Sequence, residues 1–256
     1  MPSLPTLFVS HGAPDFILHD HPAIQALQQI GQQYASPATI VIVSAHWIRD
    51  PIGVTSGASH TTIHDFYGFD EALYRLEYPA RGNPELATAL VTQLAEAGLK
   101  AQCIPDRGLD HGAWVPLMLA YPEADIPVIQ VSLPSDDLQQ CARLGKALAS
   151  FREQDILVIG SGGSVHNLRA MNREQHTGEW ARDFEAWLKQ AVESGDGSAL
   201  ENPHQATALF PRTHPSVEHY SPLLVARAAA GNGAMGLRIH SSFTYGNIGM
   251  AMYEFD

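Results

Sequence analysis

The sequence predicts one α/β domain over residues 1–256, with a mainly parallel central sheet flanked by helices. Short apolar runs rich in β-branched residues are typical of strands that are buried on both faces of a parallel sheet. These runs alternate with helical patterns along the chain, as they do in α/β folds. A chain of 256 residues can bury a sizeable core, and we find no internal repeat that would divide it.

Strand patterns occupy five short segments, and helical patterns fill the intervals between them. The expected strands are residues 4–10, 38–44, 126–133, 155–160 and 237–243. The expected helices are residues 22–34, 84–97, 112–120, 136–151, 178–193 and 217–230. Residues 194–216 carry Gly, Pro, Asn, His and Thr without periodicity, so we expect an ordered loop there.

The composition excludes several classes of protein. An apolar fraction of 45% and a charged fraction of 16% fit a globular chain rather than a disordered one. The net charge of -12 repels phosphate backbones and anionic membranes, so we expect no nucleic-acid or membrane partner. Cys103 and Cys141 are too few for a disulfide framework, and residues 1–5 lack the features of a signal peptide. We therefore expect a cytoplasmic protein, either a monomer or a small homo-oligomer.

Histidine is the unusual residue in the composition, with 13 copies against 15 Lys and Arg together. His11 directly follows the first expected strand, and His46 follows the second. Open parallel sheets bind ligands outside the carboxyl ends of their strands, so these two side chains are expected to converge on one crevice. His166 lies beyond the strand at residues 155–160, after a glycine-rich turn. Three histidines therefore share one edge of the predicted sheet.

This edge is the predicted metal site. Neutral imidazole binds Fe, Zn, Cu and Ni well. A single histidine at a strand end is more often a hydrogen-bonded structural residue than a ligand, but three at equivalent strand ends favour a metal. The glycine-rich turn at residues 160–163 lacks both a Gly-Lys-Ser/Thr ending and dinucleotide-binding spacing, so it does not indicate phosphate binding.

Two further histidines stand near helix starts. His111 precedes the helix at residues 112–120, where it could reach into the crevice as a proton donor or acceptor. His219 lies near the start of the helix at residues 217–230. Each could instead be a capping or surface histidine, and neither decides the function alone.

A series of motifs in a fixed order carries a family resemblance. The motifs are His11-Gly12-Ala13-Pro14, Ser44-Ala45-His46-Trp47, residues 62–69, Leu73-Tyr74, Tyr78-Pro79-Ala80, Asp110-His111-Gly112, Gly160-Ser161-Gly162, Val165-His166-Asn167 and Glu218-His219-Tyr220. Together they resemble the class III extradiol ring-cleavage dioxygenases of the LigB-type superfamily, in particular the DOPA-dioxygenase branch. The likeness spans almost the whole chain.

The resemblance implies a role for six histidines. It implies that His11, His46 and His219 ligate the metal, that His166 is the acid/base residue, that His111 lines the substrate site, and that His64 contacts the substrate. It further implies Fe(II) as the working metal, a small aromatic diol and O2 as substrates, extradiol ring opening, and a place in aromatic compound catabolism. Zn(II) is expected to occupy the site in crystals, since divalent ions bind in an order that places Zn above Fe(II).

The third ligand leaves other functions open. Protocatechuate-cleaving relatives complete their site with a glutamate, and Glu218 stands beside His219. Neighbours on a helix point about 100° apart, so only one of these two can face the metal, and the resemblance favours His219. A three-histidine site also holds hydrolytic zinc, so a zinc-dependent hydrolase is an alternative. A non-enzymatic metal-binding interaction protein of the same fold is another.

Overall fold

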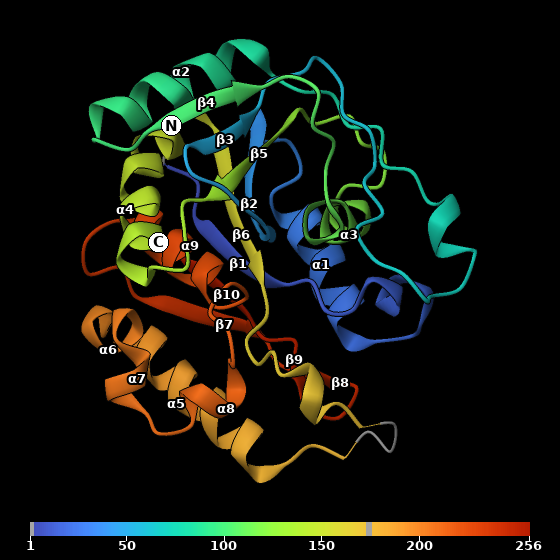
Figure 1. Ribbon diagram of the computed structural model, residues 1–256, viewed down its shortest axis with the longest axis vertical. Coiled ribbons are helices and arrows are strands. Elements are labelled where there is room, and N and C mark those ends of the chain that lie inside the picture. The colour runs from blue at the N-terminus through green and yellow to red at the C-terminus, as the bar shows by residue number, and fades with distance from the viewer. Residues whose placement is uncertain (1–2, 173–175) are drawn as a thin grey trace.

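A sheet with the strand order β4-β3-β5-β2-β6-β1-β10-β7 runs through the computed structural model, which describes residues 3–172 and 176–256 (Figure 1). Its strands are β1 (Thr6–Ser10), β2 (Thr39–Ile48), β3 (Ile52–Thr55), β4 (Ala101–Ile104), β5 (Val128–Leu133), β6 (Ile156–Gly162), β7 (Gly236–His240) and β10 (Met252–Phe255). A separate ribbon pairs β8 (Phe243–Thr244) with β9 (Ile248–Gly249).

The centre of the sheet is parallel, as predicted. The neighbours β5, β2, β6 and β1 all pair in parallel, so their carboxyl ends meet at one edge. Within the described part of this sheet, the antiparallel strand pairs lie towards the flanks, where β3 meets β5 and where β10 lies between β1 and β7. The predicted α/β fold class is confirmed.

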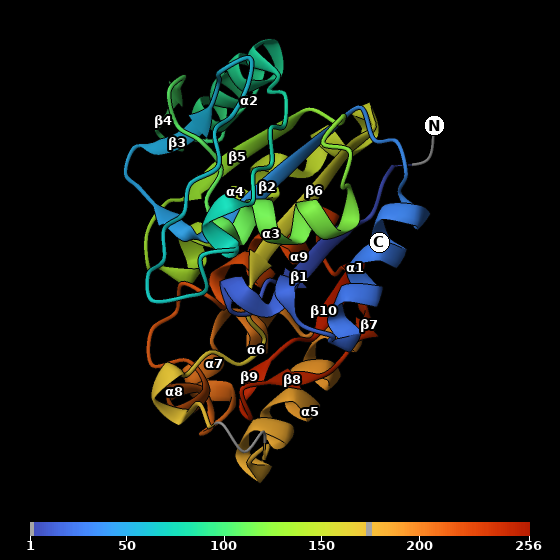
Figure 2. The same ribbon diagram turned by 90° about the vertical axis from the view of Figure 1, so that its right-hand side faces the viewer.

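Helices cover both faces of the sheet (Figures 1 and 2). They are α1 (Pro22–Gln33), α2 (Pro84–Glu96), α3 (His111–Ala120), α4 (Leu138–Leu148), α5 (Glu179–Glu193), α6 (Gly197–Glu201), α7 (Pro203–Ala206), α8 (Phe210–Thr213) and α9 (Ser221–Ala230). Short 3-10 helices are η1 (Pro14–Leu18), η2 (Leu73–Arg75), η3 (Ala149–Gln154) and η4 (Leu168–Ala170).

Alternation along β2 shows why two helical layers form. Ile40 and Ile42 join a core cluster with α1 and α3, whereas Val41 and Val43 join a cluster with α2, α4 and α9. Successive side chains of a strand point to opposite faces, so a run that is apolar at every position must be buried on both sides. No helix in the described residues is long and apolar enough to cross a membrane.

Three parts of the chain differ from the sequence-based expectation. Strands β3, β4 and β10 were not predicted, because segments of four residues carry too little periodicity. The expected loop at residues 194–216 contains the short helices α6 to α8, which begin at a capping side chain, Asp196, or at prolines such as Pro203. The helix expected from residue 217 begins at Ser221, so His219 precedes it.

Glycines in β6 allow the start of α9 and the chain just before it to approach the sheet closely. A Cβ atom added to Gly162 would collide with the carbonyl oxygen of His219, and one added to Gly160 would collide with that of Pro222. The backbone N–H of Gly163 donates to the same His219 oxygen at 2.9 Å. The position of His219 therefore depends on the missing side chain at residue 162.

We predict that Gly162→Ala lowers the free energy of unfolding by about 1–3 kcal/mol, because the backbone that carries His219 must shift to relieve the collision. Gly163→Ala is the matched control, since its Cβ would meet no atom nearer than 3.5 Å. Urea denaturation of both variants measures the difference. Equal losses in the two variants would contradict the proposed close approach.

Candidate metal centre

Five histidines meet at the carboxyl edge of the central strands. They are His11 directly after β1, His46 near the end of β2, His111 at the start of α3, His166 after β6, and His219 before α9. His46 was expected to follow its strand, but β2 continues to Ile48. The pairing of β2 with β5 is irregular between Val43 and Ile48, so His46 lies where the regular ladder ends.

The three predicted ligands lie together. The Nε2 atoms of His11 and His46 are 3.0 Å apart. The ring centroid of His219 lies 5.3 Å from that of His11 and 4.9 Å from that of His46. Two nitrogens that each lie about 2.1 Å from one ion cannot be more than about 4.2 Å apart, so the His11–His46 pair fits a shared metal. The assignment of these three residues as ligands stays a prediction.

The potential ligand atoms also form two tighter groups. One contains His11, His46 and His111, and the other contains His166, Glu218 and His219. Within each group the atoms lie within 4.8 Å of one another. His111 is thus a geometric competitor for the third ligand position, with its ring centroid 3.9 Å from that of His46.

The tautomer of His11 is fixed by a serine behind it. The hydroxyl of Ser161 donates to the carbonyl oxygen of Gly112, so the same hydroxyl must accept from His11. The His11 Nδ1 atom lies 2.9 Å from this oxygen and therefore carries the proton. The lone pair of His11 is then on Nε2, the atom that faces His46. Histidines that ligate a metal through one ring nitrogen usually donate a hydrogen bond from the other, as His11 does here.

Glu218 holds His219 in the same tautomer. One carboxylate oxygen, Oε1, accepts from the Ser216 hydroxyl at 2.9 Å and lies 3.1 Å from Nδ1 of His219. An ionised carboxylate only accepts hydrogen bonds, so Nδ1 carries the proton and Nε2 the lone pair. Glu218 therefore supports His219 and is not merely its rival for the metal, which the sequence alone did not indicate.

Asp65 is a site residue that sequence reasoning did not single out. Its Oδ1 atom accepts from the backbone N–H of His111 at 3.0 Å and lies 2.9 Å from Nδ1 of the same residue. Burial favours a higher pKa for Asp65, but the hydrogen bonds and charge of His111 lower the pKa to about 2. Its position inside the motif at residues 62–69 was the available signal.

Burial keeps the three predicted ligand imidazoles uncharged. Desolvation, together with neighbouring imidazoles, lowers the pKa of His11 and of His219 well below 6.5. Burial likewise lowers the pKa of His46 to about 3. At neutral pH all three rings are neutral and offer the lone pairs that a transition metal requires. The donor set therefore fits a divalent metal of the iron or zinc type.

His166 lies against this group without a partner of its own. Its ring stacks on that of His219 with the centroids 3.4 Å apart and the planes 7° from parallel. Neither of its ring nitrogens has a hydrogen-bond partner among residues 3–172 and 176–256. Burial lowers the pKa of His166 from 6.5 to about 4. The neutral ring is free to accept a proton.

The five-histidine edge opens into a cavity of about 780 Å³. Its histidines are His46, His111, His166 and His219, and its apolar lining includes Phe66, Phe69, Leu168, Met171 and Ile248. His64 is not part of this lining. Its Nε2 atom is 3.0 Å from the carbonyl oxygen of Leu76, and its ring packs edge-on against Phe66 at 5.7 Å. Its substrate contact stays a prediction.

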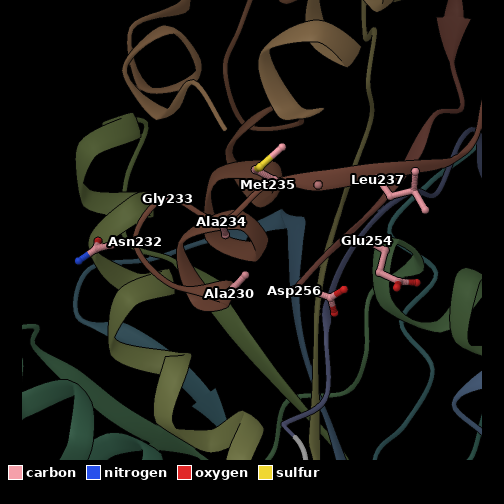
Figure 3. Close-up of a pocket in the computed structure, with 9 residues that line it drawn as sticks. Ala230, Asn232, Gly233, Ala234, Met235, Leu237, Glu254 and Asp256 are labelled. Carbon is pink, nitrogen blue, oxygen red and sulfur yellow. The ribbon is translucent and has the colours of Figure 1, made fainter. Parts of the chain in front are cut away.

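A second hollow of about 540 Å³ lies at the other end of the strands, beside the end of α9 and the start of β7 (Figure 3). Phe255, next to two of its lining residues, pairs with Thr6 at the beginning of β1. Its described lining includes the carboxylates of Glu254 and Asp256 but no imidazole. Of these two cavities, only the first has, in its described lining, histidines that could bind a metal.

We predict that the metal-free protein loses stability as the pH falls from 7 to 5. The pKa of His214, a buried histidine beside the centre, is lowered by burial to about 4, against 6.5 in the unfolded chain. Between these two pKa values the unfolded state binds more protons than the folded state, so the free energy of unfolding decreases as the pH is lowered. The loss from His214 alone is about 2 kcal/mol at pH 5.

Urea denaturation of chelator-treated protein at pH 7 and pH 5 measures this loss. His214→Gln is compared with the wild type, because the difference between the two pH values cancels any change in overall stability. Between pH 7 and pH 5, the free energy of unfolding should decrease by about 2 kcal/mol less in the variant than in the wild type. Identical pH dependence in both proteins would contradict the prediction.

Comparisons of the sequence and the structure with known proteins agree on one family. Residues 5–255 match the family described as "Catalytic LigB subunit of aromatic ring-opening dioxygenase". The chain is 38% identical over 256 residues to a "4,5-DOPA dioxygenase extradiol" of Beta vulgaris, covering 98% of this chain and 96% of the relative. A protein of the same name from Escherichia coli K12 is 36% identical over 238 residues, covering 88% and 85%. The crystal structure of an uncharacterized protein from Escherichia coli K12 is similar with a TM-score of 0.82 and 29% identity, covering 99% and 100%.

Proposed function

Because this chain belongs to the family of catalytic LigB subunits of aromatic ring-opening dioxygenases, and is an extradiol dioxygenase by that relationship, we propose that it opens the ring of a DOPA-like catechol with O2. The carbon–carbon bond beside the diol is cleaved. Both atoms of O2 enter the product, one as an aldehyde oxygen and one in a carboxylic acid. The observation that carries the proposal is a cluster of histidines in a cavity whose lining includes aromatic side chains.

We propose that His11, His46 and His219 hold the metal and that Fe(II) is the working ion. Support comes from the free Nε2 lone pairs of His11 and His219, each set by a hydrogen bond at Nδ1. Fe(II) at this place would supply Lewis acidity to the catechol oxygens and electron density to O2. The cavity of about 780 Å³ is large enough for a substituted catechol beside such an ion.

His166 is the proposed acid/base residue. Its neutral ring lines the cavity and stacks on His219, so a ring nitrogen can take a proton from a catechol hydroxyl and later return it to the product. His111 lines the same cavity, and its Nδ1 atom lies 2.9 Å from Oδ1 of Asp65. The Nε2 atom of His111 is the ring nitrogen that Asp65 does not occupy, so it can exchange a hydrogen bond with a substrate hydroxyl.

The family relationship weighs against the two alternative functions. A zinc hydrolase would also use three histidines, so zinc found in crystals would not decide between the reactions. Activity that needs zinc and proceeds without O2 would favour the hydrolase. An interaction protein without activity has no need of a base, yet His166 and His111 are both present in the cavity. We keep the cytoplasm as the proposed location, supported by the free thiols of Cys103 and Cys141.

We predict that His166→Ala and His46→Ala separate proton transfer from metal binding. His166→Ala should keep its iron and lose turnover by roughly 10²- to 10⁴-fold, the usual worth of a positioned proton-transfer group. His46→Ala should lose the iron itself. Both variants are loaded anaerobically with Fe(II), and bound iron and oxygen consumption with a panel of catechols are then measured.

The paired readout decides between the assignments. If His166→Ala loses iron as completely as His46→Ala, then His166 is a ligand and the base must be sought at His111. If His46→Ala retains its iron, the predicted ligand set is wrong. If the iron-loaded wild type consumes no oxygen with any catechol, the proposed reaction itself is wrong.

A further inference from the structure

A carboxylate shares the cavity with the histidines. Asp15 lies in η1, four residues after His11, and both Asp15 and Tyr245 line the cavity that holds His46, His111 and His166. The reaction proposed above requires an aromatic diol and a metal, and gives no role to an acid at this position. Its bonding therefore indicates what else the cavity recognises.

The carboxylate of Asp15 accepts fewer hydrogen bonds than it has the capacity for. The hydroxyl of Tyr245 donates to Oδ2 at 2.5 Å, while Oδ1 has no hydrogen-bond partner among the described residues and is shielded from water. The nearest basic side chain, His19, lies 3.5 Å from the same Oδ2 and is 62% exposed. The side chain of Asp15 is 16% exposed and a carboxylate oxygen can accept two hydrogen bonds, so a ligand in the cavity can donate to Oδ2 beside the Tyr245 hydroxyl.

Tyr245 is built to hold this carboxylate in place. Burial and the adjacent Asp15 raise the pKa of Tyr245 to about 12, so the hydroxyl keeps its proton and donates. The backbone of Tyr245 has a φ of +46°, a conformation uncommon for residues other than glycine. The Asp15 hydrogen bond helps to offset the cost of this conformation and fixes the carboxylate at the wall of the cavity.

The charges of the cavity favour a cation beside Asp15. Two carboxylates, Asp15 and Glu218, belong to its lining, and the part of the lining that the structure describes contains no Lys or Arg. Glu218 already accepts from His219 and Ser216. Asp15 is therefore the charged group that remains to meet the substituent of a bound aromatic ring.

We propose that Asp15, positioned by Tyr245, is the specificity residue that binds a protonated amino group on the side chain of the catechol. The preferred substrates are then amine-bearing catechols, and neutral or purely anionic catechols are disfavoured. A charge-assisted hydrogen bond inside a cavity with an apolar lining discriminates strongly, because the alternative leaves the carboxylate unpaired. This inference rests on the proposed ring-opening function and names the substrate class for it.

The first test compares substrates on iron-loaded Asp15→Asn, which has nearly the same shape without the charge. Oxygen uptake is measured with dopamine, neutral 4-methylcatechol and anionic 3,4-dihydroxyphenylacetate. We expect kcat/KM to fall roughly 10- to 100-fold for dopamine, to change less than about twofold for 4-methylcatechol, and to rise for the anion. Asp20→Asn, an exposed acid outside the described cavity lining, is the matched control and should match the wild type.

The outcome separates recognition from a structural role. Equal losses for all three substrates in Asp15→Asn, with the same pattern in Tyr245→Phe, would mean that Asp15 only supports the fold and would overturn the proposal. An unchanged kcat/KM for dopamine in Asp15→Asn would overturn the proposal as well.

A binding measurement keeps the inference testable if no catechol is oxidised. Tyramine and p-cresol share the phenol ring, and only tyramine has an amine. Calorimetry on the wild type should show tyramine binding roughly 10-fold or more tightly than p-cresol, and Asp15→Asn should remove the difference. Failure of the ring-opening reaction would leave this difference in place, whereas equal binding of both ligands to the wild type would overturn the role of Asp15.

Discussion

Burial of uncharged imidazoles at one edge of the sheet is the constraint on which the rest of the site depends. A buried histidine is neutral at pH 7 because desolvation disfavours its charged form, and each neutral ring has one donor and one acceptor nitrogen. The fold satisfies the donor nitrogen of His11 with Ser161 and that of His219 with Glu218. The acceptor nitrogens that remain are the natural partners of a metal or a substrate proton.

The sheet brings these rings together by simple geometry. The parallel strands β1, β2 and β6 end at one edge, which places His11, His46 and the turn before His166 side by side. The small residues Gly160 and Gly162 then allow the segment that carries His219 to lie directly on β6. Helix α3 presents His111 from the face opposite to α9. The contacts of Gly160 and Gly162 with the segment that carries His219 therefore serve both the packing of β6 and the position of a predicted ligand, so substitutions in β6 should affect both.

The sequence predicted those features that follow from strand periodicity. His11, His46 and His166 could be placed at one edge because they follow buried apolar runs, and the parallel centre of the sheet followed from the same runs. The roles of Asp65 and Asp15 could not be predicted in this way. Asp65 reaches His111 across 46 positions of the chain, and Asp15 meets Tyr245 across 230, through loops that have no periodic pattern. Family resemblance supplied His219, because a histidine before a helix carries no signal of its own.

The ligand set is the central claim, and a crystal structure of anaerobically iron-loaded protein tests it most directly. Anomalous scattering at the iron edge should give one peak in the cavity, within bonding distance of Nε2 of His11, His46 and His219, with Glu218 still bonded to Nδ1 of His219. A peak bound instead to the carboxylate of Glu218, or one that includes His111 and leaves His219 free, would contradict the account.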